Sequence, residues 1–163
     1  MVQRIGQGKA EAVFHAGVTG GFRGQGSPND PDLQVAILPL EDLDGRRYCV
    51  EDFHVLVMTL FLTEADDGVT NVGEAKQLFA PTVMSFVLDG EPLETTRLPV
   101  KPFLKLAPAK AFILVQGRVV APGEPPAGSH TLTVTIENDP VVPEVQVKTT
   151  RFFIDEAGTG ACT

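Results

Sequence analysis

Short apolar runs, separated by glycine and proline, make up most of the chain after residue 32. The run Ser129–Glu137 alternates apolar and polar positions with a period of two, which is the pattern of a half-buried β-strand. We expect His130, Leu132, Val134 and Ile136 to face inward and the intervening threonines outward. Short apolar runs bounded by turn residues predict further strands over Leu33–Leu38, Arg46–Val50, Phe53–Thr63, Pro81–Leu88, Leu93–Leu98, Lys110–Val120 and Val145–Ile154.

The segment Phe53–Thr63 is apolar on both faces of the predicted strand. A strand of this kind is covered on both sides, whereas one face of an antiparallel sheet normally meets water. The second cover is expected from the Gly-rich N-terminal arm, from the segment Val69–Ala80, or from another subunit.

Two further local features are predicted. The turn Asp89-Gly90-Glu91-Pro92 lies between two apolar runs and indicates a hairpin, in which glycine supplies a positive φ. In Val145–Ile154 the apolar positions change parity, from Val145 and Val147 to Phe152 and Ile154. A β-bulge near Thr149 and Thr150 would reconcile the two halves.

The length of 163 residues, with 16 glycines and 13 prolines, suits one β-rich domain. Five glycines crowd into residues 17–26 and are followed by Ser27-Pro28-Asn29-Asp30-Pro31. We therefore expect a Gly-rich N-terminal arm or loop over residues 1–32, a β-sandwich domain over 33–155 and a C-terminal tail over 156–163.

Three strings within residues 81–155 carry a resemblance to a known family. They are Phe86-Val87-Leu88-Asp89-Gly90, the run from Pro126 to Val134, and Thr149-Thr150-Arg151-Phe152-Phe153-Ile154-Asp155. Together they resemble a bacterial immunoglobulin-like β-sandwich module. The resemblance implies an all-β fold, an immunoglobulin-like antiparallel β-sandwich with extra N-terminal strands, and very little chemistry, because this sandwich hosts many unrelated functions.

The net charge of −8 and the absence of a Lys/Arg cluster disfavour nucleic-acid binding. No stretch approaches the roughly 20 apolar residues of a membrane helix, so we expect a soluble protein without membrane contact. Met1–Ala10 contains no apolar signal region, which predicts a cytoplasmic location while leaving export open. Cys49 and Cys162 lack CxxC spacing and are expected as free thiols; if the protein is exported, one bridge pinning the C-terminal tail becomes possible.

Candidate reactive groups do not form a convincing site, and the sequence predicts no catalytic residue, metal ligand or cofactor. Ser129 and His130 are consecutive on a strand and point to opposite faces, so they cannot form a dyad. Cys49 with His54 is interpreted as a buried thiol and an edge histidine. The loop Gly20–Gly26 lacks the residues that complete a phosphate-binding motif. The three histidines lack the close spacing of metal ligands; they are His15, His54 and His130.

Acidic residues gather in two predicted loops, which leaves calcium as an alternative. They are Asn29, Asp30 and Asp32 in one loop and Glu64, Asp66 and Asp67 in the other. The two groups would form a calcium site only if they converge at one end of the sandwich, and solvated turns explain them more simply.

The sequence therefore predicts a non-catalytic binding or assembly module with a protein partner or, through Phe53–Thr63, a homo-oligomer. One alternative is a small hydrophobic ligand binder with a pocket between the sheets; another is a calcium-stabilised sandwich. An enzyme would require the fold to gather Asp, His and Thr residues in a cleft. The residues expected to line a hydrophobic pocket are Phe53, Met58, Phe61, Phe79, Met84 and Phe112.

Overall fold

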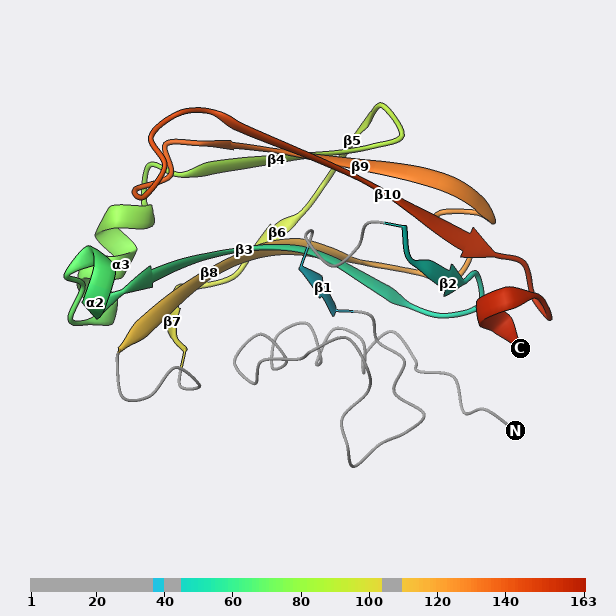
Figure 1. The fold of residues 1–163 in the computed structure, drawn as a ribbon, viewed down its shortest axis with the longest axis horizontal. Coiled ribbons are helices and arrows are strands. Elements are labelled where there is room, and N and C mark those ends of the chain that lie inside the picture. The colour runs from blue at the N-terminus through green and yellow to red at the C-terminus, as the bar shows by residue number, and fades with distance from the viewer. Residues whose placement is uncertain (1–36, 40–44, 104–109) are drawn as a thin grey trace.

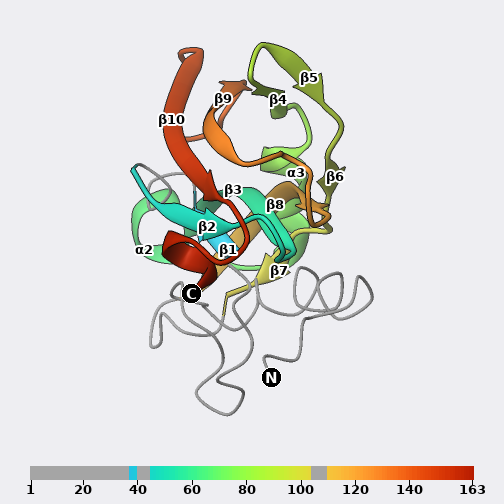
Figure 2. The same cartoon turned by 90° about the vertical axis from the view of Figure 1, so that its right-hand side faces the viewer.

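Two stacked β-sheets form the part of the chain that the computed structural model describes, namely residues 37–39, 45–103 and 110–163 (Figure 1). Sheet A has the order β1 (Ile37–Pro39), β3 (His54–Thr63), β8 (Ala111–Val120) and β6 (Thr96–Arg97), and β7 (Lys101–Pro102) also pairs with β8. Sheet B has the order β2 (Arg47–Cys49), β10 (Gln146–Asp155), β9 (Gly128–Glu137), β4 (Val83–Leu88) and β5 (Glu91–Leu93). Figure 2 shows the same two layers from the side. The all-β prediction is confirmed.

The hydrophobic core lies between the two sheets. Strand β3 contributes its even-numbered side chains from Leu56 to Leu62, and β9 contributes Leu132, Val134 and Ile136, which are completely buried. His130 is buried on the same face of β9. The alternation predicted for this strand is thereby confirmed.

Two short helices that the sequence pattern did not predict close one end of the sandwich (Figure 1). The hydroxyl oxygen of Thr63 accepts a hydrogen bond from the N–H of Asp66 and caps the start of α2 (Glu64–Asp67). The side chain of Asn71 caps the start of α3 (Val72–Phe79) by accepting a backbone hydrogen bond in the same way. Ala75 and Phe79 of α3 are fully buried in the inter-sheet core. The segment Val69–Ala80 therefore completes that core and is not the second cover of β3.

Burial on both faces is confirmed for the first half of β3, where Val55 and Val57 on the outer face are as inaccessible as Leu56 on the inner face; farther along the outer face, Phe61 is 41% exposed. Antiparallel pairing sets Gly117 of β8 opposite Val57, and a Cβ at Gly117 would collide with the backbone oxygen of Leu56. The glycine thus permits the two strands to approach closely. The Gly-rich arm lies outside the described residues, so its role as the second cover stays a prediction.

The hairpin between β4 and β5 is confirmed. Leu88 pairs with Glu91, and Asp89 and Gly90 between them have φ values of 52° and 86°, as a tight hairpin turn requires. The predicted strand Leu93–Leu98 is wrong as a single element, because its first residue ends β5 in sheet B and Thr96–Arg97 forms β6 in sheet A. The chain crosses there from sheet B to sheet A, and the order of apolar residues along the sequence does not indicate this crossing.

The predicted β-bulge in β10 is also wrong. The pairing of β10 with β9 runs without interruption from Gln146 opposite Ile136 to Ile154 opposite Gly128. Phe152 and Ile154 face the core, whereas Val147 lies on the outer face and is 64% exposed. The change of parity in the sequence thus reflects valines on the surface and not an inserted residue.

The C-terminal tail is covalently attached to sheet B. The short 3-10 helix η3 (Gly160–Cys162) lies beside β2, and Cys162 forms a disulfide with Cys49 of β2. The expectation of two free thiols is therefore wrong. Only the fold could reveal the bridge, because it joins Cα atoms that are 4.7 Å apart in space and 113 residues apart in sequence.

Candidate interaction surface

Strand β10 has one side that is only partly occupied by a neighbouring strand. Strand β2 pairs with it in parallel over Phe153–Asp155, and Gly45 adds one hydrogen bond to the carbonyl of Arg151. Among the described residues, no strand pairs with this side of Gln146–Thr150. We call this segment the open edge.

The backbone groups that point away from β9 along the open edge can be identified. The N–H of Phe153 donates to Arg46 at 2.8 Å, and the carbonyl of Arg151 accepts from Gly45 at 2.7 Å, so the odd-numbered residues of β10 present their backbone groups to the β2 side. Alternation along a strand then gives the same direction to the N–H and C=O groups of Val147 and Thr149. An exposed row of this kind is a template for pairing with another strand.

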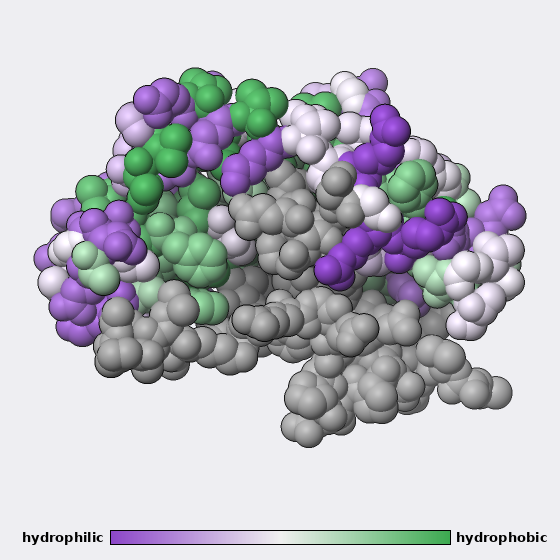
Figure 3. All heavy atoms as spheres, viewed as in Figure 1, coloured by the Kyte–Doolittle hydropathy of each residue, from purple (hydrophilic) through white to green (hydrophobic). Residues whose placement is uncertain are grey.

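Exposed valines lie at the beginning of the open edge, in the loop before it and, two strands away from it, on β4. They are Val83, Val141, Val142, Val145 and Val147, which are between 36% and 64% exposed, and we call them the valine patch. The pairing of β4, β9 and β10 places Val83 beside Glu137 and Val147 beside Thr135 on the outer face of sheet B. Figure 3 shows strongly hydrophobic residues gathered at this end of the molecule. Clustered apolar side chains at a surface are characteristic of interaction sites.

No protein-family model matches this chain, and no curated protein matches it either. Its function must therefore be inferred from the surface itself. Among the described residues, no helix has the length and apolar character needed to cross a membrane.

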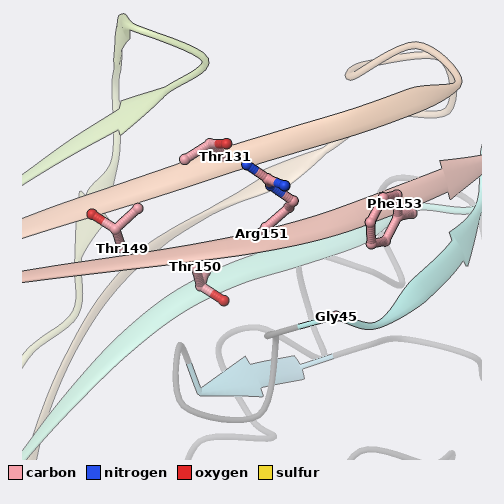
Figure 4. A pocket seen from close by; sticks show the side chains of 6 residues that line it. All are labelled: Gly45, Thr131, Thr149, Thr150, Arg151 and Phe153. Carbon is pink, nitrogen blue, oxygen red and sulfur yellow. The ribbon is translucent and has the colours of Figure 1, made fainter.

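A pocket of about 460 Å³ lies farther along β10, next to the open edge. Its lining residues are Gly45, Thr131, Thr149, Thr150, Arg151 and Phe153. Figure 4 shows the side chains of Thr149 and Thr150 on opposite sides of β10. The hydroxyl of Thr149 lies 3.1 Å from that of Thr133 on β9, so its position is fixed by a cross-strand hydrogen bond. The pocket extends the valine patch with a more polar surface.

The other half of the β10 edge is closed by a cluster around Asp155. The guanidinium of Arg47 donates to both carboxylate oxygens of Asp155, with a shortest distance of 2.6 Å, and also lies 5.3 Å from the ring centroid of Phe153. The N–H of Ala161 in η3 donates to the same carboxylate at 2.9 Å. The hydrogen bond from Arg47 lowers the pKa of Asp155, followed by the bond from Ala161. This cluster and the disulfide hold β2 and η3 in place.

His130 takes part in a structural contact that the sequence did not predict. Its Nδ1 lies 2.6 Å from a carboxylate oxygen of Asp89, and its Nε2 lies 2.7 Å from the carbonyl oxygen of Pro126. Both neighbouring atoms are hydrogen-bond acceptors. The contact links the β4–β5 hairpin to the loop before β9. Ser129 is exposed on the opposite face of β9, so it forms no dyad with His130.

The remaining candidate residues are not gathered into one site by the described structure. The sulfur of Cys49 is bonded to Cys162, with the carboxylate of Glu51 nearby, so the bridge leaves neither sulfur as a free thiolate for catalysis or metal binding. Asp66 and Asp67 hydrogen-bond to Thr63. Residues outside the described ranges are His15, Ser27, Asn29, Asp30, Asp32 and the loop Gly20–Gly26, and the side chain of His54 is not described.

The valine patch was not predicted, although the sequence contains a signal for it. Val145 and Val147 alternate with the polar residues Glu144 and Gln146, which occupy the positions of the core-facing side chains of a strand. The core residues that follow in the same strand are even-numbered, whereas these valines are odd-numbered. In a strand, this difference indicates that the valines lie on the outer face.

Proposed function

We propose that the chain is a non-catalytic binding or assembly module that acts through the outer face and open edge of sheet B. The observation that carries this proposal is the proximity of Val145 and Val147 to backbone groups of β10 that no described strand pairs with. Proteins that remain monomeric usually protect sheet edges with charge, proline or a covering element. Here Val145 and Val147 are exposed at the edge where a partner strand would dock.

An immunoglobulin-like sandwich is the fold we propose for this module. Strand order supports it: β1-β3-β8-β6 matches the order A-B-E-D of that fold, and β10-β9-β4-β5 matches its order G-F-C-C′. The direction of β1 differs, because β1 runs parallel to β3. The bridge between β2 and the C-terminal tail differs from the inter-sheet disulfide of antibody domains.

The alternative of a hydrophobic ligand between the sheets has less support. Met58, Phe79, Met84 and Phe112 are all buried in one core cluster, and Phe61 lies outside it on the other face of β3. The aromatic and methionine side chains expected to line a pocket are thus used in packing. The calcium alternative remains a prediction, because one of its two acidic groups lies outside the described residues.

An oxidising compartment is the environment we propose, in preference to the cytoplasm. The disulfide between Cys49 and Cys162 supports this proposal, because structural disulfides persist where thiols are not kept reduced. It favours export, which the sequence left open.

Photo-crosslinking in the cells that make the protein tests the binding function. A photoreactive amino acid replaces Val147 in one variant and Glu124, an exposed loop residue away from the valine patch, in a control. We expect discrete protein adducts from position 147 and none from position 124. Equal labelling at both positions, or no adduct at position 147, would refute the proposal.

A further inference from the structure

We propose that the partner of the open edge is a second copy of this chain, joined by antiparallel pairing of β10 with β10 around a two-fold axis at Gln146. This inference rests on the proposed binding function and specifies its partner. The two copies would continue sheet B into one sheet across the interface. A two-fold interface requires a self-complementary surface, and the sequence around the open edge meets that requirement.

Backbone direction restricts the possible registers. The odd-numbered residues of β10 present their N–H and C=O groups to the open side. In an antiparallel pair, the residues that exchange two hydrogen bonds must both face the partner strand. An axis at Gln146 sets Val147 opposite the partner's Val145 and Val145 opposite the partner's Val147. Both are odd-numbered, so the pairing forms about four backbone hydrogen bonds once β10 is extended by one residue at its start.

Side chains then distinguish this register from its neighbours. With the axis at Gln146, Lys148 lies opposite the partner's Glu144, and the symmetry creates this opposite-charge pair twice. An axis at Lys148 would place two ammonium groups face to face, and an axis at Val147 would set Lys148 opposite the partner's Gln146. An ammonium group has three donors, so Lys148 can engage this carboxylate in addition to its contact within its own chain.

The valines supply the apolar part of the interface. Val145 and Val147 are 60% and 64% exposed in the single chain, and the pairing sets each beside the other valine of the partner. Val147 is directly cross-strand from Thr135, so a continued sheet would carry valine and threonine side chains across the junction on its outer face. Strand pairing over so few residues buries less surface than a standard interface, so we expect a reversible dimer.

Sedimentation of the purified full-length chain measures this association. We expect a concentration-dependent shift from monomer to dimer. Val147→Pro removes a donor on the open side while leaving the ladder to β9 intact, and should weaken dimerisation at least about tenfold. Val147→Thr keeps that N–H and is the matched control, with a smaller effect. Melting temperatures of both variants establish that each is folded.

A charge exchange tests the register. Glu144→Lys and Lys148→Glu each place like charges opposite one another and should weaken dimerisation about tenfold. The double variant Glu144→Lys/Lys148→Glu restores opposite charges and should recover the wild-type dimer. No recovery in the double variant would overturn the register.

A cysteine at the two-fold axis gives an independent readout. In the proposed pairing the two copies of residue 146 form a non-hydrogen-bonded pair, at a separation that a disulfide can span. Gln146→Cys should therefore form a covalent dimer on mild oxidation, whereas Thr149→Cys, whose two copies would lie far apart, should not.

The outcomes separate this inference from the function on which it rests. A monomer at every concentration, with no covalent dimer of Gln146→Cys, overturns the second copy as partner. Photo-crosslinking from position 147 to a different protein would then retain the binding function, whereas the absence of any adduct would remove both proposals. An adduct of twice the chain mass supports both.

Discussion

Replacing Cys49 and Cys162 by serine removes a cross-link between residues separated by 113 positions in the sequence. In the chain-entropy model, a bridge that closes a loop of this length stabilises the fold by about 4.7 kcal/mol at 25 °C, because it restricts the unfolded chain. Native disulfides of small domains contribute about 2–5 kcal/mol when measured. We therefore expect the double variant to lose about 3–5 kcal/mol of unfolding free energy, a large share of the total for a domain of this size.

The loss should also have a local component at the C-terminus. Without the bridge, η3 retains the hydrogen bond from Ala161 to Asp155, and β2 retains a three-residue pairing with β10. Both are short, so they should open more often than the rest of sheet B. Amide hydrogen exchange should become faster in β2 and η3 and change less in β9.

Urea denaturation of the wild type and the double variant measures the global effect. The midpoint should fall, and the slope of free energy against urea should rise, because the unfolded chain without the bridge exposes more surface. The single variant Cys49→Ser, alkylated at the remaining thiol, should match the double variant. Equal midpoints for bridged and bridge-free proteins would refute the stabilising role of the disulfide.

Three further changes test other parts of the fold. Arg47 lowers the pKa of Asp155, so the ionised carboxylate stabilises the fold at neutral pH. This contribution disappears as the pH falls through the lowered pKa. The difference in unfolding free energy between wild type and Asp155→Asn should therefore shrink below about pH 4. Gly117→Ala should lower stability by about 1–3 kcal/mol, because the new Cβ meets the backbone oxygen of Leu56. Phe79→Ala should cost about 3–5 kcal/mol by leaving a cavity between the sheets, as measured by urea denaturation.

Each of these changes has a control. For Asp155→Asn, a difference from wild type that stays constant down to about pH 2 would contradict the charge-based contribution. Gly90→Ala also adds a Cβ, but it meets no atom within 4 Å, so its cost would come only from its positive φ. Leu78→Ala truncates a side chain that is 42% exposed on the same helix, and a loss as large as that of Phe79→Ala would contradict the assignment of Phe79 to the core.

Local pattern was sufficient for much of the sheet structure. The alternation in Ser129–Glu137 placed His130 and the three apolar residues that follow it on the buried face of β9, because successive side chains of a strand point to opposite sides. The Asp89-Gly90 turn fixed the hairpin, since its residues tolerate the positive φ that this connection requires. The two apolar parities of β3 correctly indicated burial on both faces over its first half, but not at Phe61, which is 41% exposed.

Local pattern was insufficient where an outcome depended on contacts between distant segments. The bridge of Cys49 to Cys162 and the contact of His130 with Asp89 join residues that no short-range spacing connects. The helix α3 was missed because its eight residues carry only a weak apolar stripe, and its capping by Asn71 and the burial of Phe79 stabilise it within the fold.

The sequence by itself determined that this chain forms strands, which side chains of β9 face the core, and where one hairpin turns. These features depend on the period of apolar residues and on the conformations that glycine and aspartate permit, both of which are local properties. Only the tertiary structure decided which strands are neighbours and that β2 stops short of the first half of β10. It also decided that valines with the wrong parity for the core lie beside backbone groups with which no strand of the described ranges pairs. The open edge arises because β2 is shorter than β10 and pairs with only part of it. The pairing of these two strands depends on packing between segments about 100 residues apart, which local sequence pattern does not contain.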